Sequence, residues 1–551
     1  MSFWAVFVKR GKGKKALLAL IFTYLATSVI LRFEGQRNTG LRKYTIYELV
    51  NYSSAQPTFI NKVASLFQVE ERPLLAPSLS EDEVMAMIES QISNLPFKAW
   101  QRHKNKKCSG KACVKYPSIY ELRYNNIHWQ TLRTSNGTFH LYNAFYDNRT
   151  LVEEKPVIRI LGMVDRLQPP ETYCQLWIDG FETAIISPVT NYAYIWEGSW
   201  GNHRENVMQP YLITCRMPAD NINLIPESVS LVEKPYDTST TNLRVIDNQP
   251  SSGEKEDFAV CVKGLDVGKD DLSVRITEWL ELLFILGAHK VFLYDLDVHP
   301  NVSKVIHYYE EKGRVEVTKL TLPAEQPNIP GLIHMYFKAK IVNKRQNEVI
   351  PYNDCLYKNM NRYKYIVLLD IDEIIMPRKV LSWKELMETV VHKGQENKKI
   401  PRSSYAIRNV YFLDGMQEPH GYASDIPKYM HMLQHVYRAE HYTKPGQYVK
   451  CFHDSDRILI LHNHYPFKCI GGWCSPYSVD TEVAHLQHYR STCVGELKKI
   501  CKEDFMVNTI KDSAILRFRN DLINRVQNTL IHLGFIQHAS HNATPNTDGI
   551  M

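Results

Sequence analysis

The sequence has few of the features that would place a chain in a non-globular class. It contains no internal repeat and no low-complexity tract, and 25 Gly and 27 Pro in 551 residues are too few for a collagen-like chain. Apolar residues make up 44% and charged residues 23%, which excludes wholesale disorder or a coiled coil as the main structure. The chain is therefore globular, and its length suggests about two to four domains.

Excess charge of one sign is also missing from most of the chain. The formal net charge is +7, but residues 1–43 hold nine basic residues and one acidic residue. The rest of the chain holds 57 basic and 58 acidic residues. Because nucleic-acid binding depends on a positive surface that contacts phosphates, we expect no nucleic-acid partner.

The basic residues near the N-terminus flank an uncharged apolar segment, Ala16–Leu31. Sixteen residues span about 24 Å as a helix, and snorkelling of Lys15 and Arg32 can make up the remaining bilayer thickness. The denser basic cluster should stay cytosolic. The pattern predicts a cytosolic tail at 1–15, a single-pass signal anchor at 16–33 and a luminal remainder. A cleaved signal peptide is the alternative.

Two downstream features agree with a luminal location. Asn-x-Ser/Thr sequons, which accept N-glycans in the secretory pathway, occur at Asn51, Asn136, Asn148, Asn301 and Asn542. All eleven cysteines follow the apolar segment, and an oxidising compartment would pair most of them. The close pairs Cys108/Cys113, Cys469/Cys474 and Cys493/Cys501 are the expected disulfides, and the odd count leaves at least one thiol unpaired. Zinc binding by Cys469/Cys474 is the alternative, but a second ligand pair is missing.

Composition changes along the chain predict the domain order. Residues 34–95 are polar and Pro-punctuated, as in a stem, with one helix at Glu81–Gln91. Residues 96–235 predict a β-rich, sandwich-like module. A polar linker follows at 236–257, before a domain at 258–540. The short strands expected in the module are Ile119–Leu122, Thr138–Phe145, Val157–Met163, Tyr173–Ile178 and Tyr192–Trp196.

From residue 258 the pattern becomes that of an α/β domain with a mostly parallel sheet. Expected strands are Phe258–Leu265, Lys290–Tyr294, Val315–Leu320, Tyr365–Leu369 and Tyr405–Tyr411. Expected helices are Asp271–Leu286, Lys304–Lys312, Met335–Gln346 and Cys355–Asn361. Such sheets bind ligands at the carboxyl ends of their strands, where Asp266, Asp295 and Asp370 occur.

The acidic residues after the strand Tyr365–Leu369 carry the clearest chemistry. If the strand continues, Asp370 and Asp372 point the same way and Ile371 turns into the apolar layer. Carboxylates in that arrangement suit Mn²⁺ or Mg²⁺, and such an ion neutralises a diphosphate leaving group. An acidic turn that caps the next helix is the alternative.

The order and spacing of several motifs in residues 256–510 resemble glycosyltransferase family 92. A weaker resemblance covers the segment around 144–149. The motifs are R-I-T-E-W-L-E at 275–281, V-F-L-Y-D at 291–295, D-C-L at 354–356, D-I-D-E at 370–373 and H-Y-R at 488–490. The resemblance implies an A-type nucleotide-sugar transferase fold, a type II Golgi membrane protein, and inverting transfer of galactose from UDP-galactose to a glycan.

The resemblance also identifies His488 as a third metal ligand beside Asp370 and Asp372. A neutral imidazole is a reasonable ligand for Mn²⁺. His485 lies three residues away and would share a helical face, so the choice between the two histidines depends on the resemblance.

Donor binding is expected at Arg275, Asp295 and Asp370. The alternatives are that Arg275 pairs with Glu278 in its own helix and that Asp295 caps a turn. Lys450 and Arg457 could offset phosphate charge, although both could equally be solvated. Trp473 could stack on a sugar face or pack beside a disulfide.

Inverting transfer needs a base that deprotonates the acceptor hydroxyl. Asp414 and Glu418 lie in a Gly-containing loop after the strand Tyr405–Tyr411 and are the first candidates. Glu440, Asp480 and Glu482 are the alternatives.

Taken together, the expected activity is metal-dependent transfer of a hexose from a UDP-sugar donor to a glycan or glycoprotein acceptor. A non-catalytic luminal glycan-binding protein on the same scaffold is the main alternative, although a binding protein has no need of both Asp370 and Asp372. A two-metal hydrolase would need a fuller set of His and Asp ligands than the sequence presents. Acceptor identity, linkage position and oligomeric state have no signal in the sequence.

Overall fold

The computed structural model describes residues 79–103, 110, 113–396, 398, 400–493 and 495–537. The predicted cytosolic tail, the anchor at 16–33, nearly all of the stem, and the sequons at Asn51 and Asn542 lie outside these residues. Within them, no helix combines the length and the apolar character needed to cross a membrane.

The described part begins with two helices, α4 (Glu81–Gln91) and α5 (Phe97–His103). The prediction of a helix at Glu81–Gln91 is confirmed, and residues next to its first turn explain where it begins. The Ser80 hydroxyl accepts a hydrogen bond from the Glu83 backbone N–H, and the Glu83 carboxylate accepts one from the Ser80 N–H. This reciprocal capping box satisfies two backbone donors that the first turn leaves free.

A β-rich module is present, and its sheet closes on itself. The described strands follow the order β1-β2-β3-β4-β7-β6-β5-β8-β9, and β9 also pairs with β3, so the strands from β3 to β9 form a closed ring to which β1 and β2 are attached at β3. The strands are β1 (Tyr124–Asn126), β2 (Trp129–Thr134), β3 (Gly137–Asp147), β4 (Val157–Val164), β5 (Tyr173–Trp177), β6 (Ile185–Tyr194), β7 (Gln209–Arg216), β8 (Ser228–Val232) and β9 (Leu243–Ile246). Short 3-10 turns occur at Gly198–Trp200 and Ala219–Asn221.

One predicted strand in this region is wrong. Residues 118–121 form a hydrogen-bonded turn in which the Glu121 N–H donates to the Ser118 carbonyl, so Ile119–Leu122 has no strand partner. In the segment predicted as a linker, residues 243–246 form β9, and β10 begins at Glu256.

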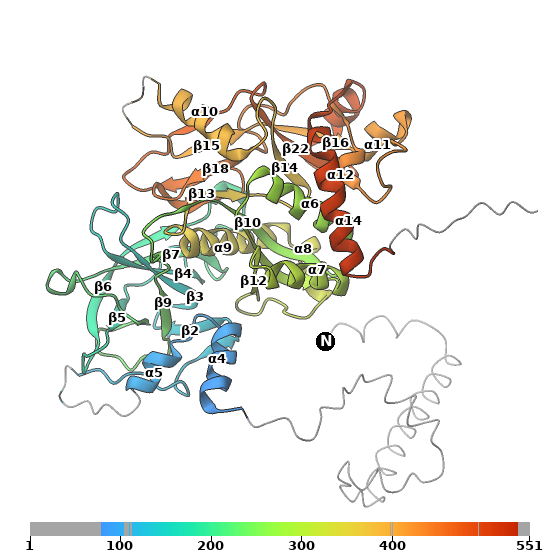
Figure 1. Ribbon diagram of the computed structural model, residues 1–551. Helices are drawn as coiled ribbons and strands as arrows, with labels where there is room; N and C mark the ends of the chain where they lie inside the picture. The colour runs from blue at the N-terminus through green and yellow to red at the C-terminus, as the bar shows by residue number, and fades with distance from the viewer. Residues whose placement is uncertain are drawn as a thin grey trace, which may run out of the picture. The chain divides into compact units, whose positions relative to one another are not determined.

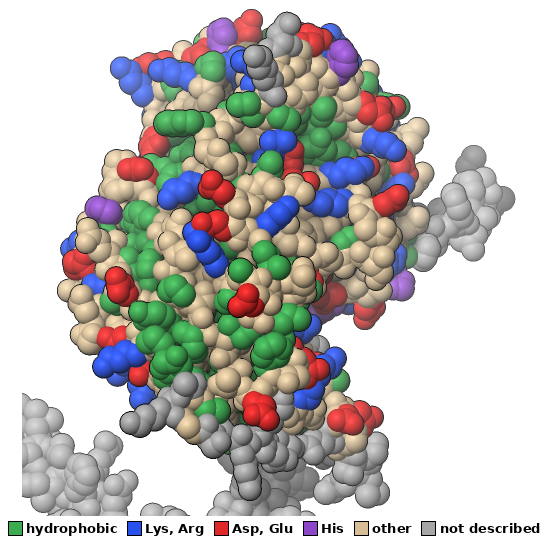
Figure 2. Space-filling model, turned by 90° about the vertical axis from the view of Figure 1, so that its left-hand side faces the viewer, with side chains coloured by type: hydrophobic (Ala, Val, Ile, Leu, Met, Phe, Trp, Pro, Cys, Tyr) green, Lys and Arg blue, Asp and Glu red, His purple; other side chains and the backbone are tan. Residues whose placement is uncertain are grey.

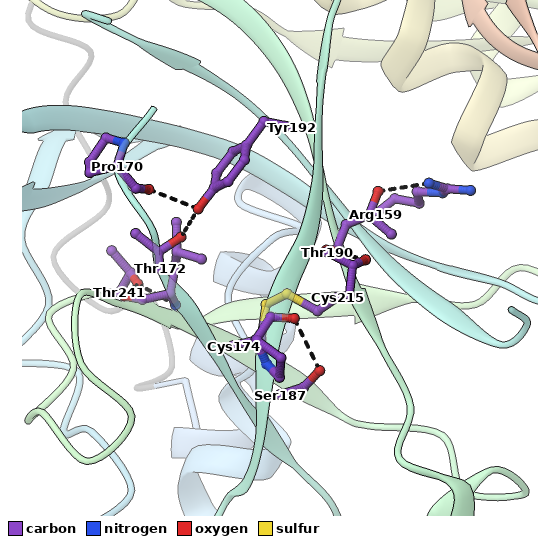
Figure 3. The surroundings of a disulfide bond; sticks show 12 residues. Arg159, Pro170, Thr172, Cys174, Ser187, Thr190, Tyr192, Cys215 and Thr241 are labelled. Carbon is purple, nitrogen blue, oxygen red and sulfur yellow. Dashed lines mark hydrogen bonds between the residues drawn. A yellow bond between two sulfur atoms is a disulfide. The ribbon is translucent and has the colours of Figure 1, made fainter. Parts of the chain in front are cut away.

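The disulfide Cys174–Cys215 crosses the interior of the closed sheet. It joins β5 to β7, which are not neighbours in the sheet, and both cysteines are fully buried in the module's apolar core. Nearby, the Tyr192 hydroxyl donates to the Pro170 carbonyl and contacts Thr172, which fixes the loop before β5 (Figure 3).

A seven-stranded sheet forms the second part, in the order β12-β11-β10-β13-β18-β15-β21. The four strands from β12 to β13 are parallel, as the α/β pattern predicts, and β18 runs antiparallel to β13. The described strands of this sheet are β10 (Glu256–Val267), β11 (Lys290–Val298), β12 (Val315–Lys319), β13 (Tyr363–Leu368), β15 (Ser404–Ile407), β18 (Lys450–Asp454) and β21 (Pro476–Ser478).

Helices cover both faces of this sheet. The longer ones are α6 (Ser273–Leu286), α7 (Pro300–Glu311), α8 (Leu332–Ala339), α9 (Ile341–Asn359), α10 (Trp383–Gln395) and α14 (Arg519–His532). Along β10, Phe258 and Val260 face the core shared with α6, α7 and α14, whereas Ala259 and Cys261 face α9. The disulfide Cys261–Cys355 joins β10 to α9.

Helix α9 lies between the seven-stranded sheet and the β-rich module (Figure 1). Its fully buried Asp354 accepts hydrogen bonds from the Tyr294 hydroxyl at 2.6 Å and from Asn143 of β3, and pairs with Lys358 at 2.7 Å. Arg149, also fully buried, donates to the carbonyl oxygens of Ser455 and Ile458, each at 2.7 Å. The two sheets therefore share one buried interface in which the polar groups are paired.

Smaller elements complete the fold. A three-stranded sheet has the order β14-β22-β16, and the pairs β17–β23 and β19–β20 stand apart. These strands are β14 (Glu373–Pro377), β16 (Asn409–Leu413), β17 (Tyr437–Ala439), β19 (Ile458–Leu461), β20 (Pro466–Cys469), β22 (Ala484–Arg490) and β23 (Thr509–Lys511). Short helices are α11 (Asp414–Gln417), α12 (His431–Gln434) and α13 (Lys498–Ile500), with single turns at Glu418–His420, Gly495–Leu497, Cys501–Phe505 and Ala514–Phe518.

The predicted pairs Cys469–Cys474 and Cys493–Cys501 are confirmed as disulfides. Cys108 of the third predicted pair lies outside the described residues. Among the described cysteines the free one is Cys451, and burial raises the pKa of its thiol to about 12, so it stays protonated at neutral pH. Acidic and basic side chains are interspersed over the face shown in Figure 2, in keeping with the absence of excess positive charge.

Candidate active site

Two cavities lie at the carboxyl ends of the parallel strands. A cavity of about 460 Å³ and one of about 330 Å³ share the side chains of Lys263, Lys344, Asp370 and Arg490. Because β10 and β13 are adjacent and parallel, their ends bring Lys263 and Asp370 to the same place. The acidic residues at the strand ends predicted a ligand-binding site at this edge of the sheet, and both cavities lie there.

Asp370 and Asp372 do not continue the strand, so that part of the prediction is wrong. β13 ends at Leu368 and β14 begins at Glu373, and the residues between them form a turn. The Glu373 carboxylate accepts a hydrogen bond from the Asp370 N–H at 2.9 Å, which stabilises the turn. Both aspartates nevertheless line the 330 Å³ cavity, because the tight turn directs them toward the same space.

Two lysines, the half-buried Lys263 and the fully buried Lys450, compensate the acidic residues. Lys263 Nζ lies 3.0 Å from Asp370 Oδ1, and Lys450 Nζ lies 3.1 Å from Glu373 Oε2 and 3.6 Å from Asp370 Oδ2. Burial alone would raise the pKa of the Asp370 carboxyl, but the charges of Lys263 and Lys450 outweigh it and hold that pKa well below its usual value. For Glu373, burial outweighs Lys450, and its pKa is raised.

His488 lies on β22, opposite Glu373 of β14. Because β22 is a strand, His485 and His488 point to opposite faces, and the expectation of a shared helical face is wrong. His485 Nδ1 contacts the Tyr442 hydroxyl, away from the cavities, whereas His488 lines the 460 Å³ cavity. Of the two histidines, His488 is therefore the one that reaches the cavities, and it is also the one to which the resemblance points.

Asp372 and His488 lie close enough to share a divalent cation, whereas Asp370 pairs with Lys263 and Lys450, and the ligand atoms of the three residues are not all within 4.8 Å of one another. His488 Nδ1 lies 3.0 Å from Asn409 Oδ1, which can only accept, so Nδ1 carries the proton. In the neutral ring His488 Nε2 is then a lone pair, and it has no hydrogen-bond partner in the described structure. It lies 3.5 Å from Asp372 Oδ2, an arrangement of two acceptors that a cation between them would stabilise.

The other predicted donor-binding residues fall in different places. Arg275 lines the 330 Å³ cavity together with Asp370 and Asp372. Asp295 pairs with Lys319 at 2.8 Å and lines a separate cavity with His128 and Asn143 of the β-rich module. The structure therefore brings Arg275 to the candidate site but not Asp295.

Neither first candidate for the base lines either of the two adjoining cavities. Glu418 is exposed, and Asp414 faces His431 and His435. The alternatives Glu440, Asp480 and Glu482 are exposed as well, and so is Trp473, at 100%. Of the sequons within the described residues, Asn136 is exposed, and Asn148 and Asn301 are half-buried.

Several side chains of the site were not among the residues predicted from the sequence. Lys263 interrupts the apolar run of β10, which is a usable signal, but Glu348 lies in the middle of α9, where nothing in the sequence singles it out. Trp196 and Trp200 reach the 460 Å³ cavity from the β-rich module. Their flat apolar faces are typical of sugar-binding surfaces.

Two solved structures are similar to limited portions of this chain. The S. aureus TarS 1–349 complex with UDP has 10% identity and a TM-score of 0.18, covering 28% of this chain and 36% of that chain. The WbbM bifunctional glycosyltransferase has 9% identity and a TM-score of 0.17, covering 39% of this chain and 36% of that chain. Likeness at these TM-scores supports no conclusion.

No curated protein matches the chain. In contrast, residues 256–526 match the model of "Glycosyltransferase family 92". The matched segment contains Lys263, Asp370, Asp372 and His488 and begins at the first residue of β10. The segment 256–526, just under half of the chain, therefore belongs to glycosyltransferase family 92.

Proposed function

We propose that this glycosyltransferase transfers a hexose, galactose from UDP-galactose, onto a glycan or glycoprotein acceptor, with inversion and with a divalent cation. The observation that carries the proposal is that Asp370, Asp372 and His488 line the two adjoining cavities beside Lys263 and the buried Lys450. The galactose donor and the inversion follow from the resemblance to the family.

The side chains around the cavities suit a nucleotide diphosphate. Lys263, Lys344 and Arg490 line both cavities, and Arg275 lines the smaller one, so a diphosphate placed here would meet positive charge from several elements. Asp370, Asp372 and His488 would hold Mn²⁺ or Mg²⁺, which neutralises charge on a diphosphate leaving group when bound. The larger cavity, with Trp196 and Trp200, has the aromatic lining that an acceptor sugar would contact.

The cellular location is proposed on separate grounds. The apolar segment at 16–31 with its basic flanks supports a single-pass type II Golgi membrane protein. The disulfides and the exposed sequon at Asn136 are in keeping with a luminal body.

A non-catalytic glycan-binding protein on the same scaffold is the second candidate. It is favoured by one observation, that Asp414 and Glu418 do not line the cavities. On this reading the aromatic cavity would bind a glycan and no sugar would be transferred.

The decisive experiment measures UDP release by the full chain. UDP-galactose, UDP-glucose and UDP-N-acetylglucosamine are compared, each with Mn²⁺ and with EDTA. We expect turnover of UDP-galactose that EDTA abolishes, and its loss in Asp372→Asn. The matched control is Asp521→Asn, which removes an exposed carboxylate paired with Arg525 on α14. Turnover unchanged in Asp372→Asn would overturn the metal assignment, and glycan binding without turnover of any donor would favour the second candidate.

A further inference from the structure

A second cluster of potential metal ligands lies outside both cavities. Asp414, the first residue of α11 directly after β16, faces His431 and His435, which come from α12 and the residue after it. Asp414 Oδ1 lies 3.4 Å from His431 Nε2 and 3.2 Å from His435 Nε2. Within the described residues, this is the one group of three such side chains whose ligand atoms all lie within 4.8 Å of one another.

The proton positions on His435 leave a lone pair directed at a carboxylate. His435 Nδ1 lies 2.6 Å from the carbonyl oxygen of His431, and a carbonyl only accepts, so Nδ1 donates. In the neutral ring, Nε2 is then an acceptor that faces Asp414 Oδ1. The His435 side chain is 5% exposed, and its Nε2 has no hydrogen-bond partner. A buried acceptor and a carboxylate at 3.2 Å repel each other unless a positive charge lies between them.

The distances match those of a tetrahedral metal site. Zinc lies about 2.0–2.1 Å from His nitrogen and carboxylate oxygen, and the edge of a tetrahedron is about 1.6 times that length, or about 3.3–3.4 Å. The distances from Asp414 Oδ1 to the two histidine Nε2 atoms, 3.2 and 3.4 Å, are close to this edge length. Two imidazoles and one carboxylate are also a common donor set for Zn²⁺ with a water in the fourth position.

The cluster is held in place by surrounding structure rather than by the ligands alone. Glu278 of α6 is fully buried, and its carboxylate accepts hydrogen bonds from the backbone N–H groups of His431, Met432 and Leu433 at 2.6, 3.0 and 2.9 Å. These bonds fix the start of α12 against α6. The His435 Nδ1 bond to the His431 carbonyl orients the second ring, as the outer contacts of metal-bound histidines do.

We propose that Asp414, His431 and His435 bind one Zn²⁺ ion, with water as the fourth ligand. The ion would join the start of α11 to α12 and so close the loop that runs between Asp414 and His431. The site shares no ligand with Asp370, Asp372 and His488, and it does not depend on the proposed function. It also gives Asp414 a role other than that of the base.

The test measures metal content and metal spectroscopy on the full chain. After dialysis against Zn²⁺ and then metal-free buffer, we expect about one zinc per chain by mass spectrometry, and tetrahedral d–d absorption when Co²⁺ replaces zinc. His435→Asn and Asp414→Asn should each lose both signals. The control variants His392→Asn, which changes an exposed histidine of α10, and Asp372→Asn should keep both.

Two results would overturn the proposal. One is a wild-type chain that retains no zinc and gives no d–d absorption. The other is wild-type zinc content in a His435→Asn variant that is folded by circular dichroism. If that variant fails to fold, the cobalt spectrum of the wild type still decides the question, because it needs no substitution.

Discussion

Replacing Lys450 by Met tests whether the charges of the candidate site are balanced as described. The Lys450 ammonium is fully buried and lies 3.1 Å from Glu373 Oε2 and 3.6 Å from Asp370 Oδ2. At an effective dielectric constant of about 20, each attraction amounts to about 5 kcal/mol, and much of it offsets the cost of removing the ions from water. Loss of one partner leaves the carboxylates uncompensated, so we expect Lys450→Met to lower the free energy of unfolding by about 3–5 kcal/mol.

The loss should depend on pH in a definite direction. Burial already raises the pKa of Glu373 above the ordinary value of 4.5 for a glutamate, and Lys450 opposes the rise. Without Lys450 the pKa rises further, so the folded protein holds a proton that the unfolded chain has released. Stability then falls as pH rises from about 4.5 through the raised pKa, and the effect of Lys450→Met should be larger near pH 8 than near pH 5.

Calorimetric or urea unfolding of both proteins at the two pH values measures these differences. The matched control is Lys364→Met, whose ammonium lies 2.8 Å from Asp257 but is 57% exposed, and surface pairs contribute about 0–1 kcal/mol. The reasoning is refuted if Lys450→Met destabilises the protein no more than Lys364→Met does. It is also refuted if the loss is larger at low pH.

Three further predictions concern the fold and the larger cavity. Replacing Cys261 and Cys355 by Ser opens a disulfide with a sequence separation of 94 and should cost up to about 4.7 kcal/mol in unfolding free energy, whereas wild-type stability would contradict the chain-entropy reasoning. Gly162→Ala on β4 places a Cβ 2.6 Å from the His140 carbonyl oxygen on β3, so we expect the free energy of unfolding to fall by about 1–3 kcal/mol. Thermal unfolding measures this change, and an unchanged stability would mean that β3 and β4 can move apart without cost. Trp200→Ala should raise the acceptor KM about 2- to 12-fold in initial-rate assays with kcat little changed, and an unchanged KM would remove the acceptor from this cavity.

Much of the fold was predictable because its signals are local. The helix at 81–91 follows from Ser80 and Glu83, which cap it within four residues. The parallel strands follow from continuous apolar runs between amphipathic helices. The closure of the β-rich sheet was not predictable, since it depends on pairing between β3 and β9, about 100 residues apart along the chain. The segment Ile119–Leu122 has strand-like residues, but a local turn outweighs their propensity.

The site was predictable in its acidic residues and less so in its basic ones. Asp370 and Asp372 follow a buried strand, which marks them in the sequence. Lys450 and Glu348 come from an antiparallel strand and a helix interior, and only the fold brings them to Asp370. His431 and His435 have the spacing of neighbours on a helix, yet their partner Asp414 precedes His431 by 17 residues. Contacts of this kind depend on tertiary structure, and the hydrophobic periodicity of the sequence does not predict them.

The position of α9 has an evolutionary consequence. The family match starts at residue 256, so the β-rich module looks like an addition that could be gained or lost. Yet Asp354 of α9 depends on Asn143, and Arg149 of the module binds backbone carbonyls of the transferase part. A descendant that lost the module would expose an apolar helix face and leave a buried carboxylate short of a partner. Selection should therefore have kept the two parts together, and substitutions on either side of α9 should be tolerated only in compensating pairs.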